Sequence, residues 1–147
     1  MPTENPRKFE SVETSNVRTL SGTCLCGAVR YEVEDQFRYS LNCHCSNCRR
    51  ATGAAFKPFA GIECGRFKIV GGADLLLIYG DDSAHDAHCG KCGSLLYSLV
   101  REARFVHVTL GTLVDSPSIR PTAHIFVGSK APWYTIMDDL PQHEELQ

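Results

Sequence analysis

The sequence predicts a mainly β protein of short antiparallel strands with one short helix. Most apolar residues lie in short alternating segments separated by glycine or aspartate, and only one stretch carries the signals of a helix. A third observation concerns what holds such short strands together. Seven of the eight cysteines fall in close groups, which is typical of metal ligands rather than of disulfides. We therefore expect a β fold stapled by zinc.

The size and charge of the chain limit its organisation. Its 147 residues, 43% of them hydrophobic, can bury the core of one domain. We expect a flexible tail over residues 1–18, where the sequence is polar and contains two prolines, and a single domain over residues 19–147. A net charge of −2 lacks the basic surface that general nucleic-acid binding requires.

No targeting segment is visible in the sequence. No apolar run approaches the roughly 20 residues of a membrane helix, so we expect no membrane partner. The first residues lack the apolar centre of a secretory signal, which predicts a cytoplasmic protein with reduced cysteines.

The expected strands follow one another from Thr19 onward. Val29, Tyr31 and Val33 alternate with charged residues, which indicates a half-buried antiparallel strand. Further strands are predicted over residues 39–42, 55–60, 67–70, 75–79, 84–88, 95–100, 105–110 and 124–127.

The one helix is predicted over residues 46–52. Ser46 is the expected N-cap and Gly53 the expected end. This helix places Cys45 and Cys48 on one face of its first turn, next to Cys43 at the end of a strand. Sulfurs bound to a tetrahedral zinc ion lie about 3.8 Å apart, a separation that this corner can provide.

Two outer cysteine pairs predict a closed metal site. Segments 24–27 and 89–93 each contain two cysteines followed by glycine, which tolerates positive φ and lets backbone N–H groups point at the thiolates. The two pairs together supply four sulfurs for a structural zinc ion. The predicted ligands are Cys24, Cys26, Cys89 and Cys92.

The inner group has only three cysteines, Cys43, Cys45 and Cys48, and is one ligand short of a tetrahedral site. An open position would admit water or substrate. Two alternatives remain at this point: a structural site closed by a distant histidine, or no metal at all. The candidate histidines are His88, His107 and His124, whereas the isolated Cys64 is not expected to be a ligand.

An open three-cysteine zinc site has a definite chemistry. Zinc lowers the pKa of a thiol or a water that enters the fourth position. Three thiolates weaken its Lewis acidity, which favours a thiol substrate over a peptide or an ester. Arg49 and Arg50 are candidate substrate-binding residues, because a guanidinium binds a carboxylate with two hydrogen bonds. Alternatively, they balance the thiolate charge or lie in solvent.

Several motifs together resemble a known family. They are segments 22–27, 43–49 and 89–94, followed by 111–113 and 132–133. In this order they resemble the glutathione-dependent formaldehyde-activating enzyme family, to which centromere protein V is also related. The resemblance covers residues 20–143 and implies a β-tent fold with two zinc ions. It implies a structural zinc on the two outer pairs and a catalytic-type zinc on Cys43, Cys45 and Cys48.

The resemblance also implies an activity. Members of the family are expected to add glutathione to formaldehyde, a carbon–sulfur lyase type of reaction that gives S-hydroxymethylglutathione. We therefore expect an enzyme that joins a small thiol to an aldehyde or reverses that reaction, with His44 or water as the acid that protonates the new alkoxide. The alternative is a non-catalytic zinc module that binds a protein partner.

Overall fold

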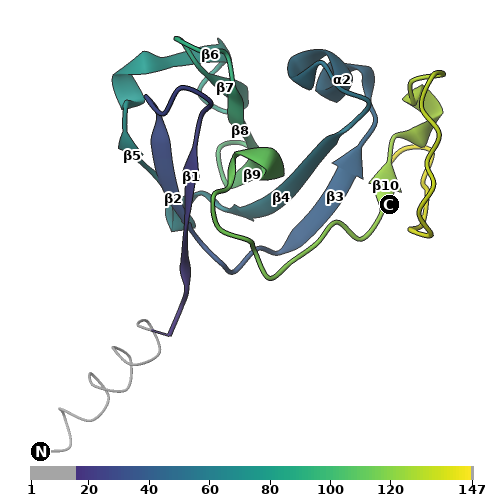
Figure 1. Ribbon diagram of the computed structural model, residues 1–147, viewed down its shortest axis with the longest axis horizontal. Helices are drawn as coiled ribbons and strands as arrows, with labels where there is room; N and C mark the ends of the chain where they lie inside the picture. The colour runs from purple at the N-terminus through teal and green to yellow at the C-terminus, as the bar shows by residue number, and fades with distance from the viewer. Residues whose placement is uncertain (1–15, 147) are drawn as a thin grey trace, which may run out of the picture.

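The computed structural model describes residues 16–146 and confirms a mainly β fold (Figure 1). This part of the chain contains ten strands and one α-helix, α2 (Ser46–Thr52). The strands are β1 (Thr19–Thr23), β2 (Arg30–Glu34), β3 (Tyr39–Cys43), β4 (Lys57–Glu63), β5 (Phe67–Gly71), β6 (Leu76–Gly80), β7 (His85–Cys89), β8 (Leu95–Val100), β9 (Phe105–Thr109) and β10 (His124–Ile125). Residues 1–15 of the predicted tail lie outside the described residues.

Within residues 16–146, no helix has the length and apolar character needed to cross a membrane.

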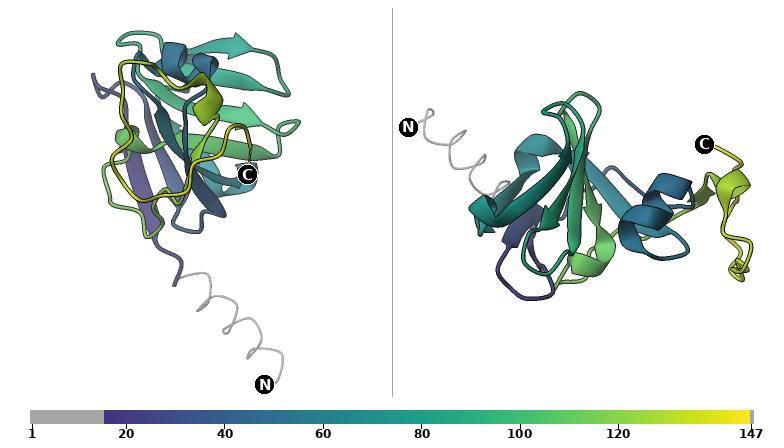
Figure 2. Two further views of the ribbon diagram at one scale, coloured as in Figure 1. Left: turned by 90° about the vertical axis from the view of Figure 1, so that its right-hand side faces the viewer. Right: turned by 90° about the horizontal axis from the view of Figure 1, so that it is seen from above.

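The strands form two sheets. The smaller has the order β1-β2-β5, and the larger has the order β10-β3-β4-β9-β8-β7-β6. Nearly all neighbours are antiparallel, as the short alternating segments predict; β10 is parallel to β3. In Figure 1 the smaller sheet lies beside the β6–β8 end of the larger one, and α2 lies over the opposite, β3–β4 end. The two views in Figure 2 show the C-terminal segment beside β10.

A first core cluster lies between the two sheets. Tyr31 and Val33 of β2 point into it, as their alternation predicts, and meet residues of the larger sheet such as Leu96 and Val106. Gly22 of β1 is paired with Tyr31, whose ring occupies the space that a β-carbon on residue 22 would need. The sequence of β1 does not show the alternation of a half-buried strand, because its five residues carry one large apolar side chain, Leu20.

A second, smaller core cluster lies under the other end of the larger sheet. Its buried members are Leu41, Cys43, Phe59, Ala123 and Ile125. Cys45 and Cys48 pack against this cluster, so the three inner cysteines lie at the edge of a packed core. The sheet therefore fixes the backbone from which they project.

Three local expectations were wrong. The strand predicted over residues 55–60 is β4, which begins at Lys57 and continues to Glu63. The helix has its predicted bounds and ends at Gly53 with φ 65°, but its N-cap is Cys45 rather than Ser46. Strand β10 stops at Ile125, two residues early, because Phe126 adopts a left-handed conformation with φ 56° and leads into a 3₁₀ turn over Val127–Ser129. A left-handed residue cannot continue the pleat of a strand.

Candidate metal centres

The outer cysteines converge into one group of four, as predicted. Cys24 and Cys26 lie in the β1–β2 loop, Cys89 ends β7, and Cys92 lies three residues further on. The sulfur of Cys26 lies 3.7 Å from that of Cys24 and 3.8 Å from that of Cys89. These separations match sulfurs on a tetrahedral ion, about 3.8 Å, and not the roughly 2 Å of a disulfide. The four sulfurs therefore fit a metal ion.

Backbone N–H groups stabilise the negative charge of this four-cysteine group. The N–H of Val29 donates to Cys24 Sγ at 3.3 Å, and the N–H of Cys92 donates to Cys89 Sγ at 3.4 Å. The glycines that follow the pairs, Gly27 and Gly93, have φ of 82° and 84° and reverse the chain as the sequence predicts. Hydrogen bonds from Ser94 lower the pKa of the Cys92 thiol to about 5.

The inner cysteines form a group of three. Cys43 is the last residue of β3, Cys45 caps α2, and Cys48 lies in its first turn. Their sulfurs lie within 4.8 Å of one another. Among residues 16–146, no histidine, aspartate or glutamate joins them, so His88, His107 and His124 do not close the site. The structure thus provides three ligands for a second metal ion.

The three inner thiols are too close together for all of them to ionise without a cation. A hydrogen bond from Cys48 lowers the pKa of Cys43 to about 6, with a further contribution from the charge of Lys57. The same hydrogen bond raises the pKa of Cys48 well above its usual range. A divalent soft metal bound at this point would hold these sulfurs as thiolates, with no proton between them.

Two cavities adjoin the three-cysteine group. One of about 200 Å³ is lined by Cys43 and Cys48 and by mostly apolar side chains, including those of Phe59 and Ile125. The other, of about 270 Å³, is lined by Cys45 and Cys48 from the α2 side. Cys48, Lys57 and His107 line both cavities. A small molecule can therefore reach the cysteines from the surface.

His107 is held as a neutral ring at these cavities. Burial lowers its pKa to about 3, helped by the positive charges of Lys57 and Arg101. Its Nε2 atom lies 2.8 Å from the Tyr39 hydroxyl, and its ring stacks on Phe59 with centroids 4.2 Å apart. His107 therefore forms an uncharged wall of the two cavities.

A buried hydrogen-bonded chain beside the cysteines was missed by sequence reasoning. Lys57 is 4% exposed, and its Nζ donates to Ser98 Oγ at 2.7 Å. The Ser98 hydroxyl in turn donates to Asp86 Oδ1 at 2.6 Å. Asp86 lies on β7, within the strand predicted over residues 84–88, and is paired with Ser98 of β8. The available signal was a lysine inside an otherwise apolar strand.

The predicted substrate-binding arginines lie on α2, outside the residues that line the two cavities. The Nε of Arg49 donates to the Ser129 carbonyl at 3.2 Å, and Arg50 is exposed. Their role in substrate binding stays a prediction. Cys64 is exposed and belongs to neither cysteine group, in line with its expected role.

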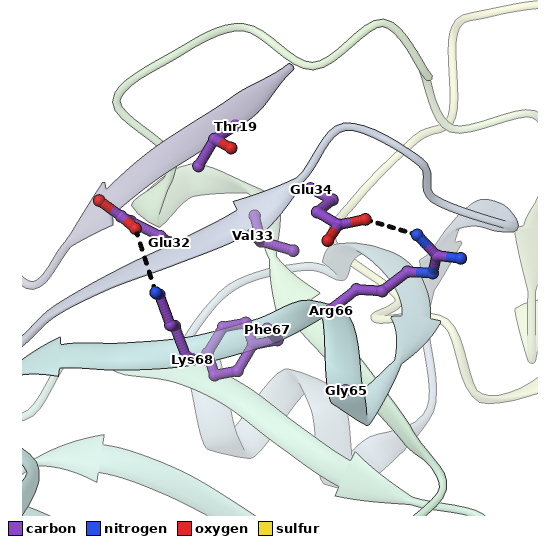
Figure 3. A pocket seen from close by; sticks show the side chains of 8 residues that line it. All are labelled: Thr19, Glu32, Val33, Glu34, Gly65, Arg66, Phe67 and Lys68. Atoms are coloured by element: carbon purple, nitrogen blue, oxygen red, sulfur yellow. Dashed lines mark hydrogen bonds and ion pairs between the residues drawn. The ribbon is translucent and has the colours of Figure 1, made fainter. Parts of the chain in front are cut away.

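A groove on the smaller sheet offers no comparable chemistry. It lies between β2 and β5 and is lined by Glu32, Glu34, Arg66 and Lys68 among others (Figure 3). Arg66 pairs with Glu34, and Lys68 lies 4.0 Å from Glu32, so the acids and bases of the groove neutralise one another. None of the clustered cysteines lines it.

Comparison with known proteins identifies the family. Residues 19–129 match the family model described as glutathione-dependent formaldehyde-activating enzyme. A Halomonas elongata protein named "Putative glutathione-dependent formaldehyde-activating enzyme" is 32% identical over 127 residues, which cover 80% of each chain. A crystal structure of a Rhodobacter sphaeroides protein aligns with a TM-score of 0.56 and 30% identity, covering 67% of this chain and 91% of the other. The chain belongs to the glutathione-dependent formaldehyde-activating enzyme family.

Proposed function

We propose that the protein is a zinc-dependent enzyme that adds a small thiol such as glutathione to an aldehyde such as formaldehyde, and that it catalyses the reverse reaction. This is carbon–sulfur lyase chemistry. The observation that carries the proposal is the three-cysteine group, which lacks a fourth ligand among residues 16–146 and lines two cavities. The β-tent assignment and a second, structural zinc on the four-cysteine group belong to the same proposal.

The donor set fits this chemistry. Three sulfurs suit a soft borderline ion such as zinc, and Cys43, Cys45 and Cys48 would hold it. Zinc bound there would supply the substrate sulfur as a thiolate. The chain itself provides the apolar wall of Phe59 and a cavity that is open to small molecules. Arg49 and Arg50 remain the proposed contacts for a carboxylate of the thiol substrate.

We place the reaction in the reducing cytoplasm. All eight cysteines are unpaired, and seven of them belong to the two metal-type groups. These thiolates must stay reduced to bind metal, a condition that the cytosol provides. A small thiol and an aldehyde are the partners that this proposal requires.

NMR exchange spectroscopy of glutathione and formaldehyde tests the proposal. We expect the zinc-loaded protein to speed exchange between free glutathione and its hydroxymethyl adduct above the uncatalysed rate. Cys48→Ser removes a ligand and should abolish the acceleration, whereas Cys64→Ser, at an exposed cysteine outside both groups, should retain it. Exchange no faster than the blank with full zinc loading would exclude this activity and favour the non-catalytic zinc module.

A further inference from the structure

Lys57 is an unusual residue to find beside three thiols. Its backbone pairs with Cys43 across the β3–β4 ladder, and its side chain lines both cavities next to Cys48. Yet within residues 16–146 no hydrogen bond joins its ammonium to a cysteine sulfur; the Nζ atom donates to Ser98. The lysine is therefore directed to a point beside the cysteines rather than onto them.

The ammonium of Lys57 has donor capacity to spare. Lysine carries three N–H donors, and Ser98 Oγ accepts one of them. The remaining two have no acceptor among residues 16–146, although the residue is 4% exposed. A buried ammonium with unused donors is costly unless an anion satisfies it, and the cavity wall is where such an anion can arrive.

The ammonium is also held in a fixed position. Ser98 Oγ lies 2.7 Å from Nζ and 2.6 Å from Asp86 Oδ1, so hydrogen bonds constrain it from two successive strands, β7 and β8. A donor that is fixed before the reaction stabilises developing charge better than one that must reorganise. The negative Asp86 balances the lysine without contacting it through any hydrogen bond of its own.

We propose that Lys57 is a catalytic residue that stabilises the negative oxygen formed when a thiolate adds to the aldehyde carbon, with Ser98 and Asp86 as positioning residues. This inference rests on the proposed function. In the addition, a sulfur lone pair forms the C–S bond while the C=O π pair moves onto oxygen. That oxygen then takes one proton from a water molecule. The proton that the thiol released restores this water. Lys57 donates a hydrogen bond to this oxygen throughout the step and keeps all of its own protons.

The experiment compares Lys57→Met with wild type in the glutathione–formaldehyde assay. Methionine keeps the length and most of the volume of the side chain and removes only the charged donor. We expect kcat to fall about 100-fold, as for the loss of one oxyanion donor, with KM for glutathione changed less than about threefold. The matched control is Lys68→Met, at an exposed lysine on β5, which should leave both constants unchanged.

A binding measurement separates this inference from the activity. Thioacetate carries a sulfur and an oxygen that share one negative charge on the same carbon, the spacing of the addition product, whereas ethanethiol carries its sulfur on a two-carbon chain without the oxygen. In cobalt-substituted protein, where thiol binding changes the absorption spectrum, wild type should prefer thioacetate. Lys57→Met should lose about tenfold of that preference and bind ethanethiol normally. Ser98→Ala keeps Lys57 but removes the hydrogen bond that holds its ammonium. This variant should lose part of the preference for thioacetate.

The outcomes are distinct. A loss of about tenfold in the thioacetate preference of Lys57→Met, with two metal ions still bound, supports the inference even if wild type proves inactive with glutathione and formaldehyde. An unchanged preference overturns it even if wild type is active. Loss of metal from Lys57→Met would also overturn it, because the lysine would then serve only to balance the thiolates.

Discussion

His44 lies in the chain between Cys43 and Cys45, two of the proposed metal ligands, but does not join their group. Its ring packs against the rings of Phe56 and Tyr134, and its Nε2 atom lies 2.8 Å from His124 Nδ1. Burial lowers the pKa of His44 to about 4, so the ring is neutral near pH 7. Its role as the acid of the reaction stays a prediction, and the contacts show a second role in fixing the loop.

The hydrogen-bond network assigns the tautomers of this histidine pair. His124 Nε2 lies 3.1 Å from both carboxylate oxygens of Asp138, and this hydrogen bond lowers the pKa of Asp138. An ionised carboxylate only accepts, so Nε2 of His124 carries a proton; in the neutral form of this ring, Nδ1 is then the acceptor for His44. The remaining His44 Nδ1 is buried without a partner among residues 16–146.

Replacing His124 should therefore destabilise the loop between two ligands. In His124→Phe, the Nε2–H of His44 stays buried and loses its acceptor, which costs about 1–3 kcal/mol of unfolding free energy. Urea unfolding of metal-loaded protein measures this. The control is His143→Phe, at a half-buried histidine whose ring has no hydrogen-bond partner within the described chain. Equal stability of the two variants would contradict the assigned network.

At the scale of elements, the short helix α2 contributes to the site through the contacts at its two ends. Its first turn is capped by Cys45, whose sulfur accepts the N–H of Cys48 at 3.3 Å, so two of the three proposed metal ligands form the cap of the helix. Its last turn ends where the N–H of Gly53 donates to the Arg49 carbonyl. Seven residues are marginal as an isolated helix, so these contacts at its two ends must hold it.

Gly53 gives a clean test of that dependence. Its φ is 65°, and a β-carbon there would meet nothing within 4 Å, so Gly53→Ala introduces conformational strain without a clash. We expect a loss of about 1–2 kcal/mol in unfolding free energy and faster loss of one metal ion to a chelator. Gly65→Ala is the matched control, because that site is equally open and its φ is not left-handed. If both variants behave like wild type, the helix end does not support the site.

The sequence predicted those parts of the fold and site that depend on local pattern. The helix, the alternating strand at Tyr31 and both cysteine groups follow from spacing, glycine and alternation within a few residues. Strand β1 and the Lys57–Ser98–Asp86 chain depend instead on which strands become neighbours. Periodicity does not contain this information, because β4, β7 and β8 meet only through the order of the larger sheet.

On the scale of the molecule, the two cysteine groups bring together segments that lie at very different distances along the chain. The four-cysteine group joins the β1–β2 loop of the smaller sheet to the β7–β8 loop of the larger one, and the bridged residues Cys26 and Cys89 are 63 positions apart. The three-cysteine group spans only the corner from β3 into α2. Closing a long loop removes more entropy from the unfolded chain than closing a short one.

This contrast predicts unequal effects for two cysteine substitutions. Cys26→Ser and Cys48→Ser should each reduce the metal content from about two ions per chain to about one. Cys26 is exposed, so its replacement disturbs little packing; we nevertheless expect a loss of about 3 kcal/mol or more in unfolding free energy, because the link between the sheets is gone. Cys48→Ser should reduce the unfolding free energy by only about 1 kcal/mol.

Metal analysis and urea unfolding, with Cys64→Ser as control, measure both effects. A larger loss from Cys48→Ser than from Cys26→Ser would make the three-cysteine group a structural site and remove the main argument for catalysis.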